Sequence, residues 1–418
     1  MTLENNVVLV PLVSVLHDPE FVKGVLDHYT TWLKGSYDMK LRSVSEAGAL
    51  YSLDLGHAAG ILALVVTGGT ERLIQSAASF GRPLMILAHE SMNSLPAVLE
   101  ALPSLDQSHG TAVAFGRNGV ELAKVKRFVA AAKALDRMKS HRIGLVGGPS
   151  SWLTYSMPDE KSLEGRFGMK VMVIPMEEFD GEYKRARKPL VAKLAKEARS
   201  KAPSVAEIND VDFDKSARIF VALKELIKKH ELTSLSIRCF DFIGKYRSTG
   251  CYAVSLLNDR GVVAGCEGDI PATVAMITLS EVTGSPTFLA NPTYVRGHKL
   301  VLAHCTIAPK LTTKYRYRTH FESGLGVAIS GALKEGERVT VARYNREYSV
   351  LRAGEGKIVK GVAWSEELCR TQAEIEMDGD AETIKDNPMG NHLVLTYGNH
   401  INLLRELASL AGMRFEEI

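Results

Sequence analysis

The sequence predicts an α/β protein in which two doubly wound domains are followed by a β-rich, barrel-like domain. Three observations support this prediction. The chain has 418 residues, which is too long for one ordinary hydrophobic core and favours two or three domains. Before Pro286, short apolar runs alternate with helical patterns, as in parallel-sheet proteins. From about Pro286 onward, short alternating runs and turn signals take over.

The first predicted domain covers residues 1–138 and has a Rossmann-like alternation of strands and helices. Residues 7–13 form a continuous β-branched and aliphatic run, which is typical of a strand buried on both faces. Helical patterns, for instance at 18–33 and 94–102, separate such runs. Further strands are predicted at residues 63–66, 83–88 and 111–115. We therefore expect a parallel, doubly wound sheet.

A second Rossmann-like domain is predicted over residues 139–285. A long amphipathic helix is expected at 212–230, where apolar side chains recur at helical spacing, and a shorter helix at 272–279. Strands are predicted at residues 142–146, 170–174, 235–238 and 261–265.

The third predicted domain covers residues 286–418 and reads as an antiparallel sheet or small barrel closed by a helix at 399–413. Turn signals at 335–337 and 353–356 separate the predicted strands. These strands are expected at residues 299–303, 325–329, 339–344, 348–351, 357–362, 373–377 and 392–397.

Composition argues against several classes of partner. A net charge of +3 without a Lys/Arg-rich arm does not favour nucleic-acid binding, and the apolar runs are too short to span a membrane. Neither GxGxxG nor a P-loop is present, so no nucleotide-binding residues are predicted. The five cysteines show no zinc spacing, and the N-terminus shows no secretory pattern. We expect a cytoplasmic protein.

Two carboxylates, Glu267 and Asp269, follow a predicted apolar strand. Asp269 stands before Pro271, which suits the first turn of a helix, and its side chain can accept hydrogen bonds from the free amides there. Capping does not explain Glu267, which lies at a strand end where a carboxylate needs a partner or a metal. We predict a catalytic role for Glu267 and keep Asp269 as a second catalytic candidate.

Other polar residues lie at predicted strand ends or in loops. His304 ends a strand, and the adjacent Cys305 points to the opposite face, which argues against a Cys–His nucleophile pair. His304 is a candidate for binding substrate, and the alternative interpretation is a buried, hydrogen-bonded histidine. A histidine such as His392 can bind a metal through a neutral ring nitrogen. The remaining candidates for lining a substrate pocket are Glu71, His320 and Glu322.

The segments 266–279, 283–291 and 390–392 resemble the metal-binding region of the L-fucose isomerase family. In that family a strand-end glutamate precedes a helix and an LTG-type turn, an aspartate follows a Phe-Ala step, and a histidine lies near the C-terminus. The layout of two Rossmann-like domains and a β domain is also similar. The chain looks most like the shorter, largely archaeal fucose-isomerase-like proteins.

The resemblance implies a Mn²⁺-dependent aldose–ketose isomerase that works through an ene-diol. Glu267 would be both metal ligand and base, and His392 a second ligand. The family's aspartate falls on Asn291, whose amide oxygen can bind a metal but cannot accept a proton. Family members are homo-trimers or homo-hexamers whose active site is completed by a neighbouring first domain. That arrangement would give Glu71 and Asn93 a reason to face the sugar.

Two alternatives stay open at this stage. The departure at Asn291 is compatible with a relative that has changed its chemistry to that of a lyase, an epimerase or a transferase in the same pocket. Two Rossmann-like domains flanking a cleft are also compatible with a non-catalytic sugar-binding protein, although that reading leaves the third domain unexplained.

Overall fold

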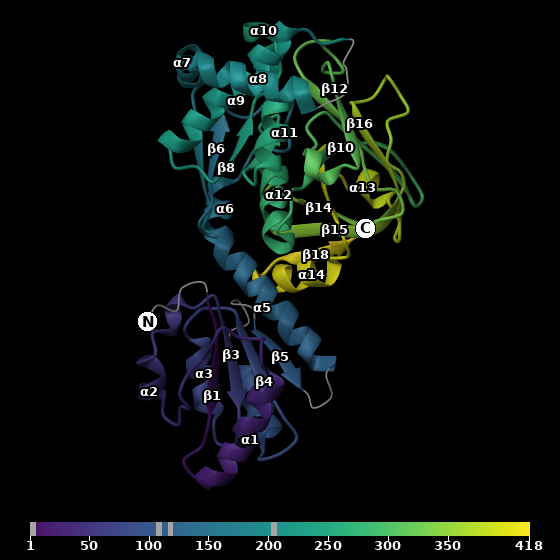
Figure 1. Cartoon of the computed structure of the whole chain (residues 1–418). Helices are drawn as coiled ribbons and strands as arrows, with labels where there is room; N and C mark the ends of the chain where they lie inside the picture. Colours follow the sequence, from purple (N-terminus) through teal and green to yellow (C-terminus); the bar gives the residue numbers. More distant parts are fainter. Residues whose placement is uncertain (1–5, 106–110, 116–119, 202–206) are drawn as a thin grey trace. The chain divides into compact units, whose positions relative to one another are not determined.

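The computed structural model describes residues 6–105, 111–115, 120–201 and 207–418 (Figure 1). The chain divides into two compact units, one formed by residues 1–137 with 402–414 and the other by residues 138–401 with 415–418. The second unit holds both a parallel sheet and the β-rich region. The three-domain division at residues 138 and 285 therefore stays a prediction.

The first unit is built on a parallel sheet of five strands in the order β2-β1-β3-β4-β5. The strands are β1 (Val7–Leu12), β2 (Met39–Lys40), β3 (Gly60–Val65), β4 (Leu84–Ala88) and β5 (Thr111–Phe115). The helices are α1 (Pro19–Trp32), α2 (Ala47–Tyr51), α3 (Glu71–Ala78), α4 (Ser94–Ala101), α5 (Val120–Met138) and α14 (Ile401–Leu410). All of β1, β3 and β4 is buried, so the continuous apolar runs in the sequence indicated these central strands correctly.

The second unit begins with a four-stranded parallel sheet in the order β7-β6-β8-β9. Its strands are β6 (Arg142–Val146), β7 (Lys170–Ile174), β8 (Ser234–Ile237) and β9 (Val263–Cys266). Its helices are α6 (Glu160–Phe167), α7 (Met176–Arg185), α8 (Lys188–Lys201), α9 (Asp210–Lys229), α10 (Phe240–Tyr246), α11 (Cys251–Asp259) and α12 (Ile270–Thr283). Both sheets share the 2-1-3-4 type of doubly wound order, which differs from the 3-2-1-4-5-6 order of the dinucleotide-binding fold.

The rest of the second unit is a closed antiparallel barrel of six strands in the order β14-β17-β10-β11-β16-β15, with β15 pairing back to β14. The predicted barrel-like character is therefore confirmed. The barrel strands are β10 (Phe288–Arg296), β11 (Lys299–His304), β14 (Arg338–Tyr344), β15 (Val350–Lys360), β16 (Thr371–Met377) and β17 (Leu393–Tyr397). Outside it lie the hairpin of β12 (Lys314–Arg318) and β13 (Ala328–Ala332), the short α13 (Thr383–Asp386), and β18 (Arg414–Glu417) beside β15.

The turn predicted at 353–356 is wrong, because these residues lie inside β15. Gly354 and Gly356 are present for close packing. A Cβ atom on Gly356 would lie 2.6 Å from the carbonyl oxygen of Glu376 and 3.0 Å from the Cα atom of Met377 on the neighbouring strand. Closing a six-stranded barrel brings strands together tightly, and glycine permits that approach. The strands predicted at 348–351 and 357–362 are consequently parts of the single strand β15.

Helix α12 links the parallel sheet to the barrel. It follows β9 and packs against β10, β14 and β17, and each residue from Ile270 to Leu279 is buried. A helix that is apolar on all sides belongs in a protein core. In the part of the chain that the structure describes, no helix is both long enough and apolar enough to cross a membrane.

Substituting Gly356 by Ala should destabilise the second unit by about 1–3 kcal/mol, because backbone atoms of β16 cannot move aside for the added methyl group. The matched control is Gly244→Ala in α10, where nothing lies within 4 Å of the added carbon. That control should be neutral or stabilising by about 0.5–1 kcal/mol. Urea unfolding followed by circular dichroism measures both, and equal stabilities would contradict the role assigned to Gly356.

Candidate metal centre

Three buried side chains, Glu267, His304 and His392, bring potential metal-binding atoms within 4.8 Å of one another. Glu267 follows β9, His304 ends β11, and His392 stands just before β17. The Oε1 atom of Glu267 lies 3.6 Å from Nε2 of His392 and 3.9 Å from Nε2 of His304. Strands β11 and β17 flank β10 in the barrel, which brings the two histidines together although they are far apart in sequence.

A sharp turn between β9 and α12 aims the Glu267 side chain. Glu267 has a φ angle of 60° and Gly268 one of 74°, so both residues adopt left-handed backbone conformations. For Glu267 this conformation costs free energy of about 1–3 kcal/mol. A Cβ atom on Gly268 would lie 2.8 Å from the carbonyl oxygen of Gly148, so the loop after β6 packs directly on this turn. Surrounding structure therefore holds Glu267 in a strained position, which is characteristic of functional sites.

The two oxygens of Glu267 have different surroundings. Oε1 faces the two histidines, while Oε2 accepts a hydrogen bond of 3.0 Å from the indole Nε1 of Trp152. Burial opposes ionisation of this carboxyl, but the two nearby imidazoles of His304 and His392 outweigh that effect and hold the pKa of Glu267 well below its usual range. Glu267 is therefore an anion that faces two imidazoles.

Asp269 occupies a second layer behind His392. Its Oδ1 accepts a hydrogen bond of 2.9 Å from the backbone N–H of Ala272, so it caps α12 as the sequence predicted. Its Oδ2 lies 2.9 Å from Nδ1 of His392, on the side of the ring away from Glu267. Burial opposes ionisation, but the Arg343 charge and the hydrogen bond from His392 lower the pKa of Asp269 to about 2. The catalytic role predicted for Asp269 stays a prediction.

Arg343 on β14 ties these parts together and was missed in the sequence. Its side chain is fully buried and donates hydrogen bonds to Asp269, to the carbonyl oxygens of Met389 and His392, and to Oγ of Ser156. The sequence did hold a signal for this burial. Alternate residues of a strand face the same way, and Arg343 lies two positions after the apolar Val341, so it is expected to face the core. Such a position in a core calls for a buried anion.

The imidazole of His392 is held in a fixed orientation, and a metal ion that bound it would displace its Nε2 proton. Asp269 holds Nδ1, and the buried Nε2 atom has no hydrogen-bond partner. Burial lowers the pKa of His392, but the two carboxylates Asp269 and Glu267 outweigh that effect and raise it to about 9. A carboxylate behind a histidine is the usual outer layer of a metal site, where it fixes the ring and the tautomer. His304 is held similarly, with Nδ1 lying 2.8 Å from Oγ1 of Thr306.

The donor set of one carboxylate and two imidazoles therefore fits a divalent metal ion. Glu267 and His392 were predicted as ligands and do come together. His304, predicted to bind substrate, joins them as a third possible ligand. Asn291 lies on β10 between the two histidine-bearing strands, and its Oδ1 accepts a hydrogen bond of 3.4 Å from Asn391. The choice of Mn²⁺ and the ligand role of Asn291 stay predictions.

His320 and Glu322 lie in the turn between β12 and β13. His320 is buried, its Nδ1 atom lies 3.1 Å from Oγ of Ser323, and its ring packs edge-on against Phe240. Phe240 in turn packs edge-on against Trp152, the partner of Glu267. The Glu322 side chain is exposed. Substrate contacts by these two residues stay predictions.

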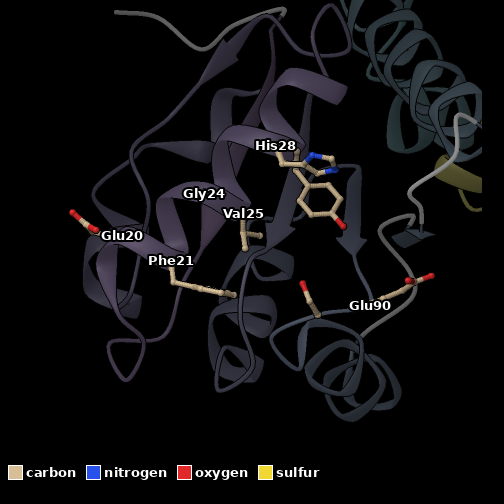
Figure 2. A pocket seen from close by; sticks show the side chains of 8 residues that line it. Glu20, Phe21, Gly24, Val25, His28 and Glu90 are labelled. Atoms are coloured by element: carbon tan, nitrogen blue, oxygen red, sulfur yellow. The ribbon is translucent and has the colours of Figure 1, made fainter.

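Glu71 and Asn93 belong to the first unit, at the carboxyl ends of β3 and β4. Glu71 begins α3, and Asn93 precedes α4 in a left-handed conformation with φ 55°. A cavity of about 640 Å³ lies nearby between α1 and the segment after β4 (Figure 2), but neither residue lines it. Its lining residues are Glu20, Phe21, Gly24, Val25, His28, Tyr29, Glu90 and Ser91. A sugar-binding role for Glu71 and Asn93 stays a prediction.

The second unit thus combines a parallel sheet, a closed barrel and a buried carboxylate–histidine cluster that could hold a metal ion. No family model matches the sequence. The chain is similar to the sulfoquinovose isomerase of Priestia megaterium, with 25% identity over 307 residues that cover 67% of this chain and 64% of that protein. It is also similar to the sulfoquinovose isomerase of Alkalicoccus urumqiensis, with 27% identity over 56% of this chain and 55% of that protein. The sulfoquinovose isomerase of Clostridium sp. is 21% identical over 70% of this chain and 68% of that protein.

The chain thus spans slightly less than two thirds of the length of the first of these relatives. The similarity points to a sugar isomerase family. This agrees with the resemblance seen in the sequence at the level of sugar isomerases. Membership of the L-fucose isomerase family in particular stays a prediction.

Replacing Arg343 by Met should lower the free energy of unfolding by about 3–5 kcal/mol, because Asp269 would become a buried charge without its cationic partner. The control is Arg316→Met on the exposed side of β12, which should change stability by less than about 0.5 kcal/mol. Thermal and urea unfolding measure the difference. Similar stabilities of the two variants would show that this ion pair does not organise the site.

Proposed function

We propose that this protein is a metal-dependent aldose–ketose isomerase that acts on a free sugar. The observation that carries the proposal is the buried cluster of Glu267, His304 and His392. Within this cluster the Nε2 atom of His392 has no hydrogen-bond partner. The similarity to proteins named sulfoquinovose isomerase supports the reaction class and makes sulfoquinovose the first sugar to test. L-Fucose is the second, from the sequence resemblance.

The metal would be held by Glu267, His304 and His392. When bound, it supplies Lewis-acid polarisation of the sugar carbonyl, which makes the neighbouring C–H acidic. Asp269 and Thr306 orient the two imidazoles through their Nδ1 atoms, so that both Nε2 atoms face Glu267. This arrangement is preformed by buried contacts, which lowers the cost of ordering the site on binding.

Glu267 would move the proton. As a general base it would take the proton from the carbon next to the carbonyl and return it to the former carbonyl carbon of the ene-diol, while the proton of the neighbouring hydroxyl passes to the former carbonyl oxygen. Asp269 is committed to the cap of α12, to His392 and to Arg343, and an amide at Asn291 cannot accept a proton. One carboxylate therefore serves both carbons in this proposal.

Asn291 is the specific observation that favours a second candidate, changed chemistry in the same pocket. A lyase, epimerase or transferase would keep the His392 and Glu267 geometry but would not convert an aldose into a ketose. The predicted homo-trimer or homo-hexamer is a separate proposal, which light scattering on the purified protein tests.

Metal binding is the first prediction of this proposal. Purified protein should retain close to one Mn²⁺ or another divalent ion per chain, and His392→Ala should lose it. Asp269→Asn should weaken Mn²⁺ affinity roughly 10–100-fold, because outer-layer carboxylates orient the ligating histidine. Elemental analysis and calorimetric titration measure these changes, with the exposed His57→Ala as control. If the unmodified protein binds no divalent ion, the metal-dependent reaction is excluded.

Glu267→Gln should lower isomerisation by at least about 10²–10⁴-fold, since a positioned general base contributes that much. The assay is proton NMR of sulfoquinovose and L-fucose in D₂O, where turnover places deuterium on the carbon next to the carbonyl. Exposed Glu337→Gln is the control and should retain full activity. Full activity in Glu267→Gln would rule out Glu267 as the base. Sugar binding by the unmodified protein without conversion of aldose to ketose would favour the second candidate.

A further inference from the structure

We propose that Trp152 is a positioning residue for Glu267 and also forms the apolar surface on which the sugar rests. This inference rests on the proposed function and adds a substrate-contacting group that the sequence did not reveal. It starts from the only indole that the described structure places on the Glu267 carboxylate.

A hydrogen bond joins Trp152 to Glu267. The indole Nε1 of Trp152 donates to Oε2 of Glu267 at 3.0 Å, while Oε1 is directed at His304 and His392. An indole has a single N–H donor and two rotatable side-chain bonds, so this contact fixes the rotation of the carboxylate at little entropic cost. Trp152 thereby keeps one oxygen of Glu267 toward the histidines and the other toward the indole.

Trp152 is itself held in place by its neighbours in the chain. The segment that carries it is tied down on both sides by residues of the site. The backbone N–H of Ser150 donates to the carbonyl oxygen of Glu267 at 3.2 Å, and Oγ of Ser156 accepts from Arg343 at 2.7 Å. Between these anchors Leu153 is buried. The segment that carries the indole is therefore anchored to the backbone of Glu267 at one end and to Arg343, which also holds His392, at the other.

The Trp152 ring is partly exposed to solvent. Trp152 remains 45% exposed although its N–H is bonded inside, so the ring presents an open surface next to a buried polar cluster. Tyr155 and Met157 on the same segment are 38% and 43% exposed. Phe240 supports the ring edge-on, with centroids 4.9 Å apart. An exposed aromatic ring directly bonded to a buried polar cluster is characteristic of a ligand site.

These features fit a sugar. A pyranose or open-chain sugar has apolar C–H faces that pack on aromatic rings, and hydroxyl edges that need polar partners. The indole supplies the first and the Glu267–His304–His392 cluster the second, joined by a direct hydrogen bond. A sugar lying on the ring therefore meets the carboxylate that moves its proton.

Fluorescence of Trp152 tests the inference without relying on turnover. The chain has three tryptophans, so W32F/W364F leaves Trp152 as the only indole. Adding Mn²⁺ should quench its emission, and adding sulfoquinovose or L-fucose should reduce its quenching by acrylamide at least threefold. In W32F/W152F, where Trp364 is the only reporter, neither addition should change the emission. No response of Trp152 to a sugar whose binding calorimetry detects would overturn the role as a sugar surface.

Kinetics and metal affinity separate the two parts of the role. Trp152→Phe keeps a ring but removes the donor, so kcat and Mn²⁺ affinity should fall 10–100-fold while KM changes less than threefold. Trp152→Ala removes both and should in addition raise KM at least tenfold. W364F should behave as the unmodified protein, and circular dichroism checks that each variant is folded. Unchanged kcat, KM and Mn²⁺ affinity in both Trp152 variants would overturn the inference.

The outcomes also separate this inference from the proposed function. Turnover by the unmodified protein that persists in both Trp152 variants defeats the inference and leaves the isomerase proposal intact. Absence of both sugar binding and turnover in the unmodified protein defeats the isomerase proposal and the sugar surface together. In that case a loss of Mn²⁺ affinity in Trp152→Phe still supports the positioning of Glu267, and an unchanged affinity removes it.

Discussion

The ion pair between Asp269 and Arg343 is the contact on which the candidate site depends. Arg343 comes from the barrel and Asp269 from the start of α12, and both are completely or almost completely buried. The same guanidinium holds the backbone carbonyl of His392 and the hydroxyl of Ser156. The Arg343 cation therefore sets the position of His392, of the helix that follows Glu267, and of the segment that carries Trp152. Gly390 lacks a Cβ atom because the guanidinium occupies that space.

Such a pair is a poor source of stability, because removing two charges from water costs nearly as much free energy as their attraction returns. Its value lies in arrangement. Two carboxylates, Glu267 and Asp269, stand on either side of the His392 ring, and one arginine does not neutralise both. Protonated His392, whose pKa these two carboxylates raise to about 9, supplies the second positive charge, and a bound metal ion would take its place. The strained backbone at Glu267 fits this view, since packing elsewhere compensates for a conformation that serves the site.

The fold and its chemistry are connected through strand ends. In open parallel sheets, ligand groups gather at the carboxyl ends of strands, and Glu267 follows β9 at such an edge. The barrel adds two histidines from strands that flank β10. Neither half could hold three ligands alone. The parallel sheet and the barrel therefore each supply part of the cluster that could hold a metal ion.

The sequence alone determined the alternation of buried strands and helices, the change to a barrel near Pro286, and the unusual position of Glu267, because these follow from local hydrophobic patterns and from the cost of burying a charge. It also indicated His392 through a resemblance. Tertiary structure decided that β15 runs through residues 353–356, that His304 faces Glu267, and that Arg343 and Trp152 hold the site. These outcomes depend on which strands become neighbours when a barrel closes. That pairing joins residues far apart in the chain, and no local pattern encodes it.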